Sequence, residues 1–512
     1  MGKQNQLKAG AFLSYLSMAL SIIIGIIYTP IMLRLLGQSE YGLYNMVAST
    51  ISMLSVLSLG LNSGYIRYFS KYKKNNDNES IYRLNGLYLI IFSIIGIIAL
   101  VCGLFLSQNL QIIFEDGLTE SEYEITKVLM ILLTINLAIS FPSSVFSHII
   151  SANERFIFLK VLGLIKTVIG PIVTLPVLLS GFGSIGMVAA TIAFSLIIDV
   201  IFFIYAKFVL KQKFVFKKLE KGLFKDLFVY TSFIALNLIV GQVNNNVDKF
   251  LLGRYCGTIS VSIYSVGYAL YNYYTNFSLA ISGVFTPRIH KIVNETAENQ
   301  FLQRKKLTNL FIKVGRIQFI VLALIASGFI FFGQHFIYFW AGDDYSQSYY
   351  VALLLIVPST IPLTQNLGIA IQRAENKHKF RSIVYAIMLL INIALSIYLC
   401  QIFDAVGACI GTAISLILAN GFIMNVYYHK KCNIDILAFW KDILKLTAGL
   451  IIPVGFGIAL GIFVNLYNIW NLIAGIIAYS IIYAISVYFI VANKEEKALC
   501  ETIFKKIIHR KK

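Results

Sequence analysis

The sequence predicts an all-α, polytopic membrane protein with about fourteen transmembrane helices. Three observations lead to this fold class: long apolar segments fill the 512 residues almost from end to end, 58% of the residues are hydrophobic, and only 13% are charged. Soluble domains have about a quarter of their residues charged, and a run of about 20 apolar residues is enough to cross a bilayer. The composition therefore excludes an ordinary soluble domain.

The apolar segments follow one another with short loops between them, and each is long enough to span the bilayer core as a helix. The predicted crossings lie near residues 10–33, 43–66, 84–106, 125–149, 159–180, 186–209, 227–252, 259–286, 311–333, 350–371, 382–402, 407–428, 443–466 and 470–492.

The charges between these segments predict the orientation. If the N-terminus is cytoplasmic, 37 of the 43 Lys and Arg residues fall in inner segments, three fall in outer segments and three lie within helices. This bias is what the positive-inside rule predicts for short loops. We therefore expect a multi-pass protein of the cell membrane with both termini cytoplasmic. The net charge of +19 is then an orientation signal, and no nucleic-acid partner is expected.

Patterns typical of catalysis and metal binding are missing from the sequence. Its six cysteines form no Cys-x-x-Cys pair, and its six histidines lack ligand spacing. No phosphate-cradling glycine loop, Ser/His/Asp group or paired-carboxylate site is evident. We expect neither an enzyme nor a metal or cofactor site.

The two halves of the chain echo each other at an offset of 221 residues, which pairs Ser184-Ile185-Gly186 with Ala405-Val406-Gly407, and Glu154 with Glu375. An offset of six helices restores the orientation, so the repeat is parallel. The sequence predicts two pseudo-symmetric six-helix lobes, with the substrate path between them. The expected divisions are an N-terminal lobe (1–222), a C-terminal lobe (223–442), and two further helices with a basic cytoplasmic tail (443–512). From Asn493 the tail reads as an amphipathic helix on the inner leaflet.

The segment 227–252 is the least lipid-like of the fourteen. At helical spacing, one polar face collects Asn237, Gln242, Asn244, Asn245, Asp248 and Lys249. Lipid cannot solvate such a face, so it lines a wet cavity or packs against another polar helix. The first alternative makes these residues a substrate or ion pathway, and the second makes them a seam without a transport role.

Other candidates for the pathway are tyrosines and intramembrane charges. Tyr264, Tyr268 and Tyr271 share one face of the segment 259–286, where they would contact sugar rings or simply pack. Tyr28 lies at one end of a row of small side chains that share one face of the first helix. This face either packs against another helix or forms part of a cavity wall. The remaining charged residues within predicted membrane-spanning segments are Asp199, Lys166 and Arg316. The aspartate is too short to reach the membrane surface, whereas the two long basic side chains could do so.

Several short motifs carry a resemblance to a known family. They are Tyr28-Thr29-Pro30, Arg34-Leu35-Leu36-Gly37, Glu40-Tyr41-Gly42-Leu43-Tyr44, Asn153-Glu154-Arg155-Phe156 and Asp248-Lys249-Phe250-Leu251-Leu252-Gly253. Their order and spacing resemble the polysaccharide flippases of the multidrug/oligosaccharidyl-lipid/polysaccharide exporter superfamily. The resemblance implies fourteen helices, alternating access of two lobes and a cationic central cavity for a pyrophosphate. The basic groups available for such a cavity are Arg34, Lys249 and Arg254 in the outer half, and Lys166 or Arg316 in the inner half.

The resemblance implies translocation of a lipid-linked oligosaccharide or polysaccharide repeat unit from the inner to the outer leaflet. Two alternatives stay open: a cation-coupled multidrug exporter that uses Asp248 or Asp199, and a non-transporting membrane subunit of glycan assembly. The expected partners are the lipid-linked oligosaccharide, a coupling cation, membrane lipids and the glycan-assembly machinery. The sequence does not identify the glycan, its lipid carrier, the ion or the oligomeric state.

Overall fold

The computed structural model describes residues 3–58, 60–114, 117–217, 221–296, 298–498 and 501, without the side chains of 3–11, 221–230 and 232–234. All regular structure in these residues is helical. By contacts between backbone positions, the chain forms two compact units: Met1–Ser265 with Leu389–Ala408, and Val266–Met388 with Cys409–Lys512. The predicted lobe boundaries stay a prediction. Most of the basic tail, including Leu499 and Ile503, lies outside the described residues.

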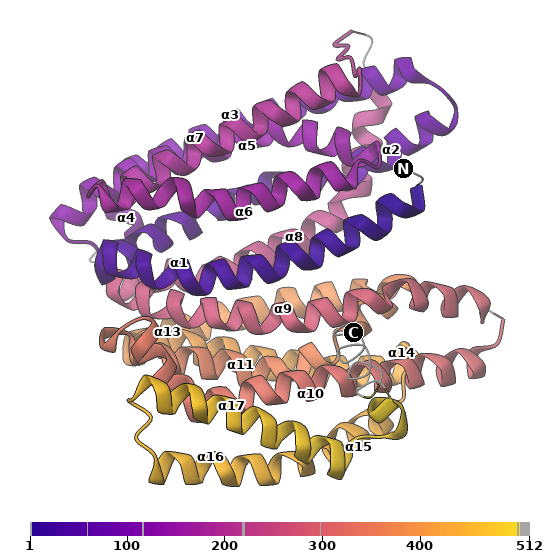
Figure 1. Cartoon of the computed structure of the whole chain (residues 1–512). Coiled ribbons are helices and arrows are strands. Elements are labelled where there is room, and N and C mark those ends of the chain that lie inside the picture. The colour runs from indigo at the N-terminus through magenta and orange to yellow at the C-terminus, as the bar shows by residue number, and fades with distance from the viewer. Residues whose placement is uncertain are drawn as a thin grey trace, which may run out of the picture. The chain divides into compact units, whose positions relative to one another are not determined.

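Unit 1 holds the N-terminal helices together with the helix that carries the predicted polar face. Within it α3 packs against α5, α1 packs against α6 and α8, and α6 packs against α7 (Figure 1). Its helices are α1 (Lys3–Met53), α2 (Leu61–Lys74), α3 (Asn78–Gln108), α4 (Leu110–Phe114), α5 (Glu120–Ala152), α6 (Phe156–Leu179), α7 (Gly183–Ile204), α8 (Lys221–Tyr255), the start of α9 (Gly257–Glu295) and the middle of α13 (Lys379–Leu416).

Unit 2 is built around α10, which packs against α11, α15 and α17, while α16 packs against α17. Its helices are the remaining parts of α9 and α13, α10 (Gln300–Trp340), α11 (Ser348–Thr364), α12 (Leu367–Ala374), α14 (Met424–Lys431), α15 (Ile436–Leu446), α16 (Ile451–Phe463) and α17 (Ile469–Ser486).

Nine helical runs of the described residues are long and apolar enough to cross a membrane, or ten if α11 and α12 form one bent span. Two of these runs, Phe12–Lys74 and Lys379–Lys431, each cover two of the predicted crossings. The polar helices α8 and α9 are not among the nine. The all-helical, apolar character is as predicted, and the number of crossings stays a prediction.

The outer surface of the helices fits a lipid environment. On α3, Ile97, Val101 and Phe105 are each more than 60% exposed. Soluble proteins rarely expose contiguous apolar surface of this kind, because water makes it unfavourable. The interior is packed with large side chains: Tyr65, Phe69, Tyr88 and Phe92 in unit 1, and Phe311, Tyr428 and Phe439 in unit 2.

Backbone breaks recur at the predicted repeat offset. Gly183 and Asp404, 221 residues apart, have positive φ values of 57° and 49°, and each stands where a new helix direction begins. Left-handed backbone is easy for glycine and costly for most other residues, so shared positions indicate a shared local requirement. The Gly183 and Asp404 pair is consistent with the repeat, which stays a prediction.

Two glycines of the family-like motifs allow close helix approach in unit 1. A Cβ atom at Gly42 of α1 would lie 1.8 Å from the carbonyl oxygen of Thr258 in the first turn of α9. A Cβ atom at Gly253 of α8 would lie 2.3 Å from the sulfur of Met46. The first contact is with backbone, which cannot move aside as a flexible side chain can. Gly42 is therefore needed for the packing of α1 against α9.

We expect Gly42→Ala to destabilise the protein by about 1–3 kcal/mol, because overpacking forces the backbone apart. The measurement is thermal unfolding of the purified protein in detergent. Gly170→Ala is the matched control, since nothing lies within 4 Å of that added Cβ. It should leave the unfolding temperature unchanged or raise it, because alanine favours helix. Equal unfolding temperatures for the two variants would contradict the packing argument.

Candidate functional site

The carboxylate of Asp248 on α8 lies at the centre of a buried cluster of oxygen atoms in unit 1. Asp248 is 2% exposed, although its helix is rich in polar residues. The Tyr264 hydroxyl of α9 donates to Oδ2 of Asp248 at 2.9 Å. The Ser396 hydroxyl of α13 lies 3.4 Å from Oδ1. The consecutive helices α8 and α9 and the distant helix α13 thus meet at one carboxylate.

The α13 side of the cluster adds further oxygen atoms. The Ser396 hydroxyl lies 3.2 Å from Oδ1 of Asn392 and 3.3 Å from the carbonyl oxygen of Ala408. Asn392, Ser396 and Ala408 are each 1% exposed or less. Asn392 and Ser396 are absent from the sequence-based candidates. Their i, i+4 spacing in an apolar segment was the available signal, because it places two polar side chains on one helix face.

This arrangement suits a small, hard cation or a proton. A carboxylate, hydroxyls, an amide oxygen and a backbone carbonyl are the ligand types that hard cations prefer. Among the described residues, no group of three or more His, Cys, Asp or Glu side chains could hold a metal ion. The contacts described above place the Asp248 carboxylate near hydroxyl, amide and carbonyl oxygen atoms. Burying that charge is costly unless it is compensated, which makes it a functional candidate.

A second set of α8 residues fastens this helix to α1 and to the 3₁₀ turn Leu54–Ser58. The Gln242 amide donates to the carbonyl oxygen of Ser52 at 3.2 Å and to the Ser55 hydroxyl. The Ser52 hydroxyl donates to Oδ1 of Asn246 at 2.9 Å. Lys249 Nζ lies 3.4 Å from Oδ1 of Asn45. Gln242 and Lys249 therefore take part in a polar seam, with Asn246 as a member that the sequence-based candidates omit.

The side of α8 next to this seam is partly exposed. Asn237, Asn244 and Asn245 are exposed, and Gly241 between them is exposed as well. Exposed amides in a helix flanked by apolar segments cannot face lipid without a large cost. The hydrogen bonds of Gln242, Asn246 and Lys249 support the seam alternative for this helix, and a wet surface along the exposed amides stays a prediction.

The remaining candidates of unit 1 lie in separate places. The Tyr28 hydroxyl is 2.7 Å from the Thr174 hydroxyl, so it joins α1 to α6. Asp199 of α7 interacts with Ser143 of α5 and with Lys166 of α6.

Of the two outer basic groups other than Lys249, Arg34 is exposed. Arg254 donates hydrogen bonds of 3.1 Å to the carbonyl oxygens of Ile112 and Ile113. Both residues belong to the short helix α4. Within unit 1, neither group lies in the Asp248 cluster.

Three candidates belong to unit 2. The rings of Tyr268 and Tyr271 lie 5.6 Å apart between centroids, as an aromatic pair on α9. Arg316 is 6% exposed and forms two hydrogen bonds with the carboxylate of Glu496, at 2.7 and 2.8 Å. This bidentate ion pair gives Arg316 a structural partner.

Comparison with protein families identifies the chain. A family model described as "Polysaccharide biosynthesis protein" matches residues 7–293, which is more than half of the sequence. The chain belongs to the polysaccharide biosynthesis protein family. The match includes the Arg34 and Glu40 motifs, the whole of α8 with Asp248, and Tyr264. A search of the curated proteins found no match.

Solved structures show which fold this polysaccharide biosynthesis protein adopts. It is similar to the lipid II flippase MurJ in an inward closed conformation, with 18% identity, a TM-score of 0.66 and coverage of 93% of this chain and 97% of that one. It is also similar to an inward-facing multidrug resistance MATE transporter of the MOP superfamily, with 15% identity, a TM-score of 0.61 and coverage of 84% and 99%. A MOP superfamily transporter from Pyrococcus furiosus gives 14% identity, a TM-score of 0.56 and coverage of 82% and 96%.

These findings confirm the coarse predictions. This polysaccharide biosynthesis protein is a multi-pass, all-helical membrane protein with the fold of the MOP superfamily. Its family is described by polysaccharide biosynthesis, and transport by this chain is a proposal. The cargo, the direction of movement and the residues of the pathway are proposals.

Proposed function

We propose that this chain moves a lipid-linked oligosaccharide or polysaccharide repeat unit from the inner to the outer leaflet by alternating access. The observation that carries the proposal is the family match over residues 7–293, because it links the chain to polysaccharide biosynthesis. The proposed machine has fourteen transmembrane helices in two six-helix lobes plus two C-terminal helices, with both termini in the cytoplasm.

In this proposal Asp248 is the coupling group. Its carboxylate is buried with Tyr264 and Ser396, so a bound cation or proton would neutralise a charge that the membrane interior disfavours. The three groups come from α8, α9 and α13, and occupancy of the cluster would favour one arrangement of those helices. A ligand shifts a conformational equilibrium only by its differential affinity for the two states. A buried carboxylate held by three helices can supply that difference.

The exposed amides of α8 are the proposed contact for the glycan. Asn237, Asn244 and Asn245 present donors and acceptors along two turns. Sugar hydroxyls need both kinds of partner, and an amide offers both in one side chain. Tyr264 is an unsuitable stacking surface in this conformation, since its ring is 2% exposed and its hydroxyl is bound to Asp248.

A second candidate function is export of lipophilic cations. It is favoured by the fold shared with a multidrug resistance transporter and by the buried carboxylate of Asp248. The purified chain in proteoliposomes separates the two. We expect a fluorescent lipid-linked oligosaccharide to change leaflets well above the rate of protein-free vesicles, and a lipophilic cation to move no faster than in them. Cation movement without oligosaccharide movement would favour the exporter.

The proposed orientation predicts which loops are reachable from each side. Single cysteines in a cysteine-free chain at 75, 215, 300 and 376 should react with a membrane-impermeant thiol reagent only after the cytoplasmic face is exposed. Cysteines at 182, 257, 344 and 404 should react in intact cells. The reason is the charge bias, in which 37 of 43 basic residues fall on the inner side. Reversed labelling at two or more loops would contradict the fourteen-helix topology.

A further inference from the structure

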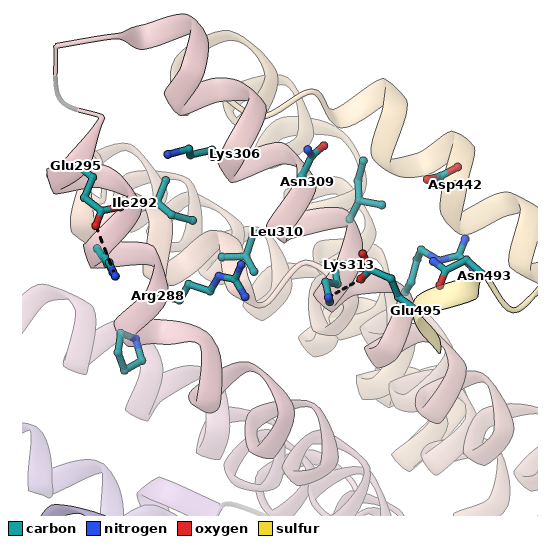
Figure 2. A pocket seen from close by; sticks show the side chains of 14 residues that line it. Arg288, Ile292, Glu295, Lys306, Asn309, Leu310, Lys313, Asp442, Asn493 and Glu495 are labelled. Atoms are coloured by element: carbon teal, nitrogen blue, oxygen red, sulfur yellow. Dashed lines mark hydrogen bonds and ion pairs between the residues drawn. The ribbon is translucent and has the colours of Figure 1, made fainter. Parts of the chain in front are cut away.

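Unit 2 has an open pocket of about 970 Å³ between the end of α9 and the first half of α10. The segment after α17 and Asp442 of α15 close its remaining side (Figure 2). This volume is in the range of sites for small molecules and headgroups, about 300–1,000 Å³. Its walls hold none of the oxygen cluster around Asp248, so it is a separate feature of the molecule.

The pocket has more positive than negative charge on its walls. Five basic side chains line it, namely Arg288, Lys291, Lys306, Lys313 and Arg316, against three acidic ones, Glu295, Asp442 and Glu495.

Each acidic side chain already has a basic partner within ion-pair distance. Lys291 pairs with Glu295 at 3.6 Å and Lys445 with Asp442 at 2.8 Å, and Lys313 pairs with Glu495. The buried Arg316 is held by Glu496.

Two of the basic groups remain available. Arg288 and Lys306 are exposed, and neither lies within ion-pair distance of a carboxylate in the part of the chain that the structure describes. Figure 2 shows Arg288 between the Lys291–Glu295 and Lys313–Glu495 pairs, with Lys306 and Asn309 on the facing helix. A planar guanidinium, an ammonium and an amide that line one pocket match the oxygen atoms of a phosphate.

We propose that this pocket binds the phosphate of an anionic membrane lipid through Arg288 and Lys306. The lipid is favoured over a free phosphate because the pocket is open and lies where α9 and α10 leave their apolar segments. Basic pockets between helices at the cytoplasmic surface bind anionic headgroups in this way. The charge bias of the loops puts this end of both helices on the cytoplasmic side. A zwitterionic headgroup fits less well, since its cation would face Arg288 and Lys306.

The carboxylate of Glu495 lies in the wall of the same pocket and already pairs with one of its basic side chains. The hydrogen bond and charge of Lys313, with a smaller effect of the Arg288 charge, hold the pKa of the Glu495 carboxyl below its usual value. The segment that carries Glu495 is fastened by Arg316, whose guanidinium also donates to the carbonyl oxygen of Val491 at 3.0 Å. A lipid phosphate that reached Lys313 would compete with Glu495. Removing this carboxylate should therefore strengthen lipid binding, whereas removing Arg288 and Lys306 should weaken it.

The test is native mass spectrometry of the full chain released from nanodiscs that contain equal amounts of phosphatidylglycerol and phosphatidylcholine. We expect bound phosphatidylglycerol to exceed phosphatidylcholine. Arg288→Gln and Lys306→Gln should each lower this preference about fivefold, the effect of one basic residue at a membrane surface, and Glu495→Gln should raise it. Lys306→Arg should retain it, because the charge remains.

The matched control is the pair Lys71→Gln and Lys74→Gln on α2, which removes two exposed charges from unit 1 and should leave the preference unchanged. If the control pair lost the same preference for phosphatidylglycerol, the effect would come from general surface charge, and the proposed site would be contradicted. An unchanged preference in the Arg288→Gln/Lys306→Gln double variant would also overturn it. Displacement of the lipid by inorganic phosphate at a similar concentration would assign the pocket to a free phosphate. All of these variants alter exposed residues, so the folded fraction should stay at the wild-type level.

Discussion

Replacing Asp248 by asparagine should abolish transport while the protein still reaches the membrane in normal amount. The carboxylate is 2% exposed and is the only acidic group of its oxygen cluster in the described residues. Asparagine keeps its shape but cannot bind a cation by charge or take up a proton. The substitution also lowers the cost of burying the side chain, so a loss of stability is not expected. The measurement is glycan export in cells that express the variant at the wild-type level.

Asp343→Asn is the matched control, because it makes the same chemical change at an exposed position of unit 2. It should export normally. Tyr264→Phe should lower the concentration of coupling ion needed for export by about tenfold and leave export measurable, since it removes a hydrogen bond that stabilises the charged, unoccupied carboxylate. Normal export by Asp248→Asn would remove this residue from the coupling site and leave it as a packing element between α8, α9 and α13.

Loss of the whole chain should stop surface polysaccharide from appearing outside the cell. Lipid-linked oligosaccharide should accumulate at the same time, because synthesis continues while its exit is blocked. The measurement is surface polysaccharide by glycan-specific staining, together with extraction of the lipid-linked intermediate. Restoring the wild-type chain should reverse both changes. Unchanged surface polysaccharide, combined with new sensitivity to lipophilic cations, would contradict the flippase proposal and favour the exporter.

Fold class could be predicted from the sequence because the bilayer imposes a strong and simple pattern. Apolar length predicts spanning helices, and loop charge predicts their orientation. The boundaries of the helices are harder to predict from the sequence. Gly37 and the Phe403–Asp404 pair interrupt helices that otherwise run on, and no local signal in the apolar sequence marks Asp404 as a residue with a φ of 49°.

The sequence marks some members of the Asp248 cluster and not others, for a physical reason, and the role of the cluster stays a proposal. Asp248 stands out because a charge in an apolar segment needs a partner, and the structure supplies Tyr264 from the predicted tyrosine face. Ser396 and Asn392 stand out only weakly, as a polar pair at i, i+4 spacing, since hydroxyls and amides are common in membrane helices. Their approach to Asp248 depends on the packing of α13 in unit 1, about 150 residues away in sequence, which no periodicity reveals. Arg316 was a pathway candidate, and its partner Glu496 lies 180 residues away.

Translocation itself is tested most directly by the leaflet in which the accumulated lipid-linked oligosaccharide resides when the chain is absent. Inside-out and right-side-out vesicles from such cells can be treated with a membrane-impermeant reagent that labels the glycan. The proposed function predicts labelling in inside-out vesicles only, because the oligosaccharide stays on the cytoplasmic leaflet. Labelling in right-side-out vesicles would mean that the oligosaccharide crosses without this chain, and would contradict its role as the flippase.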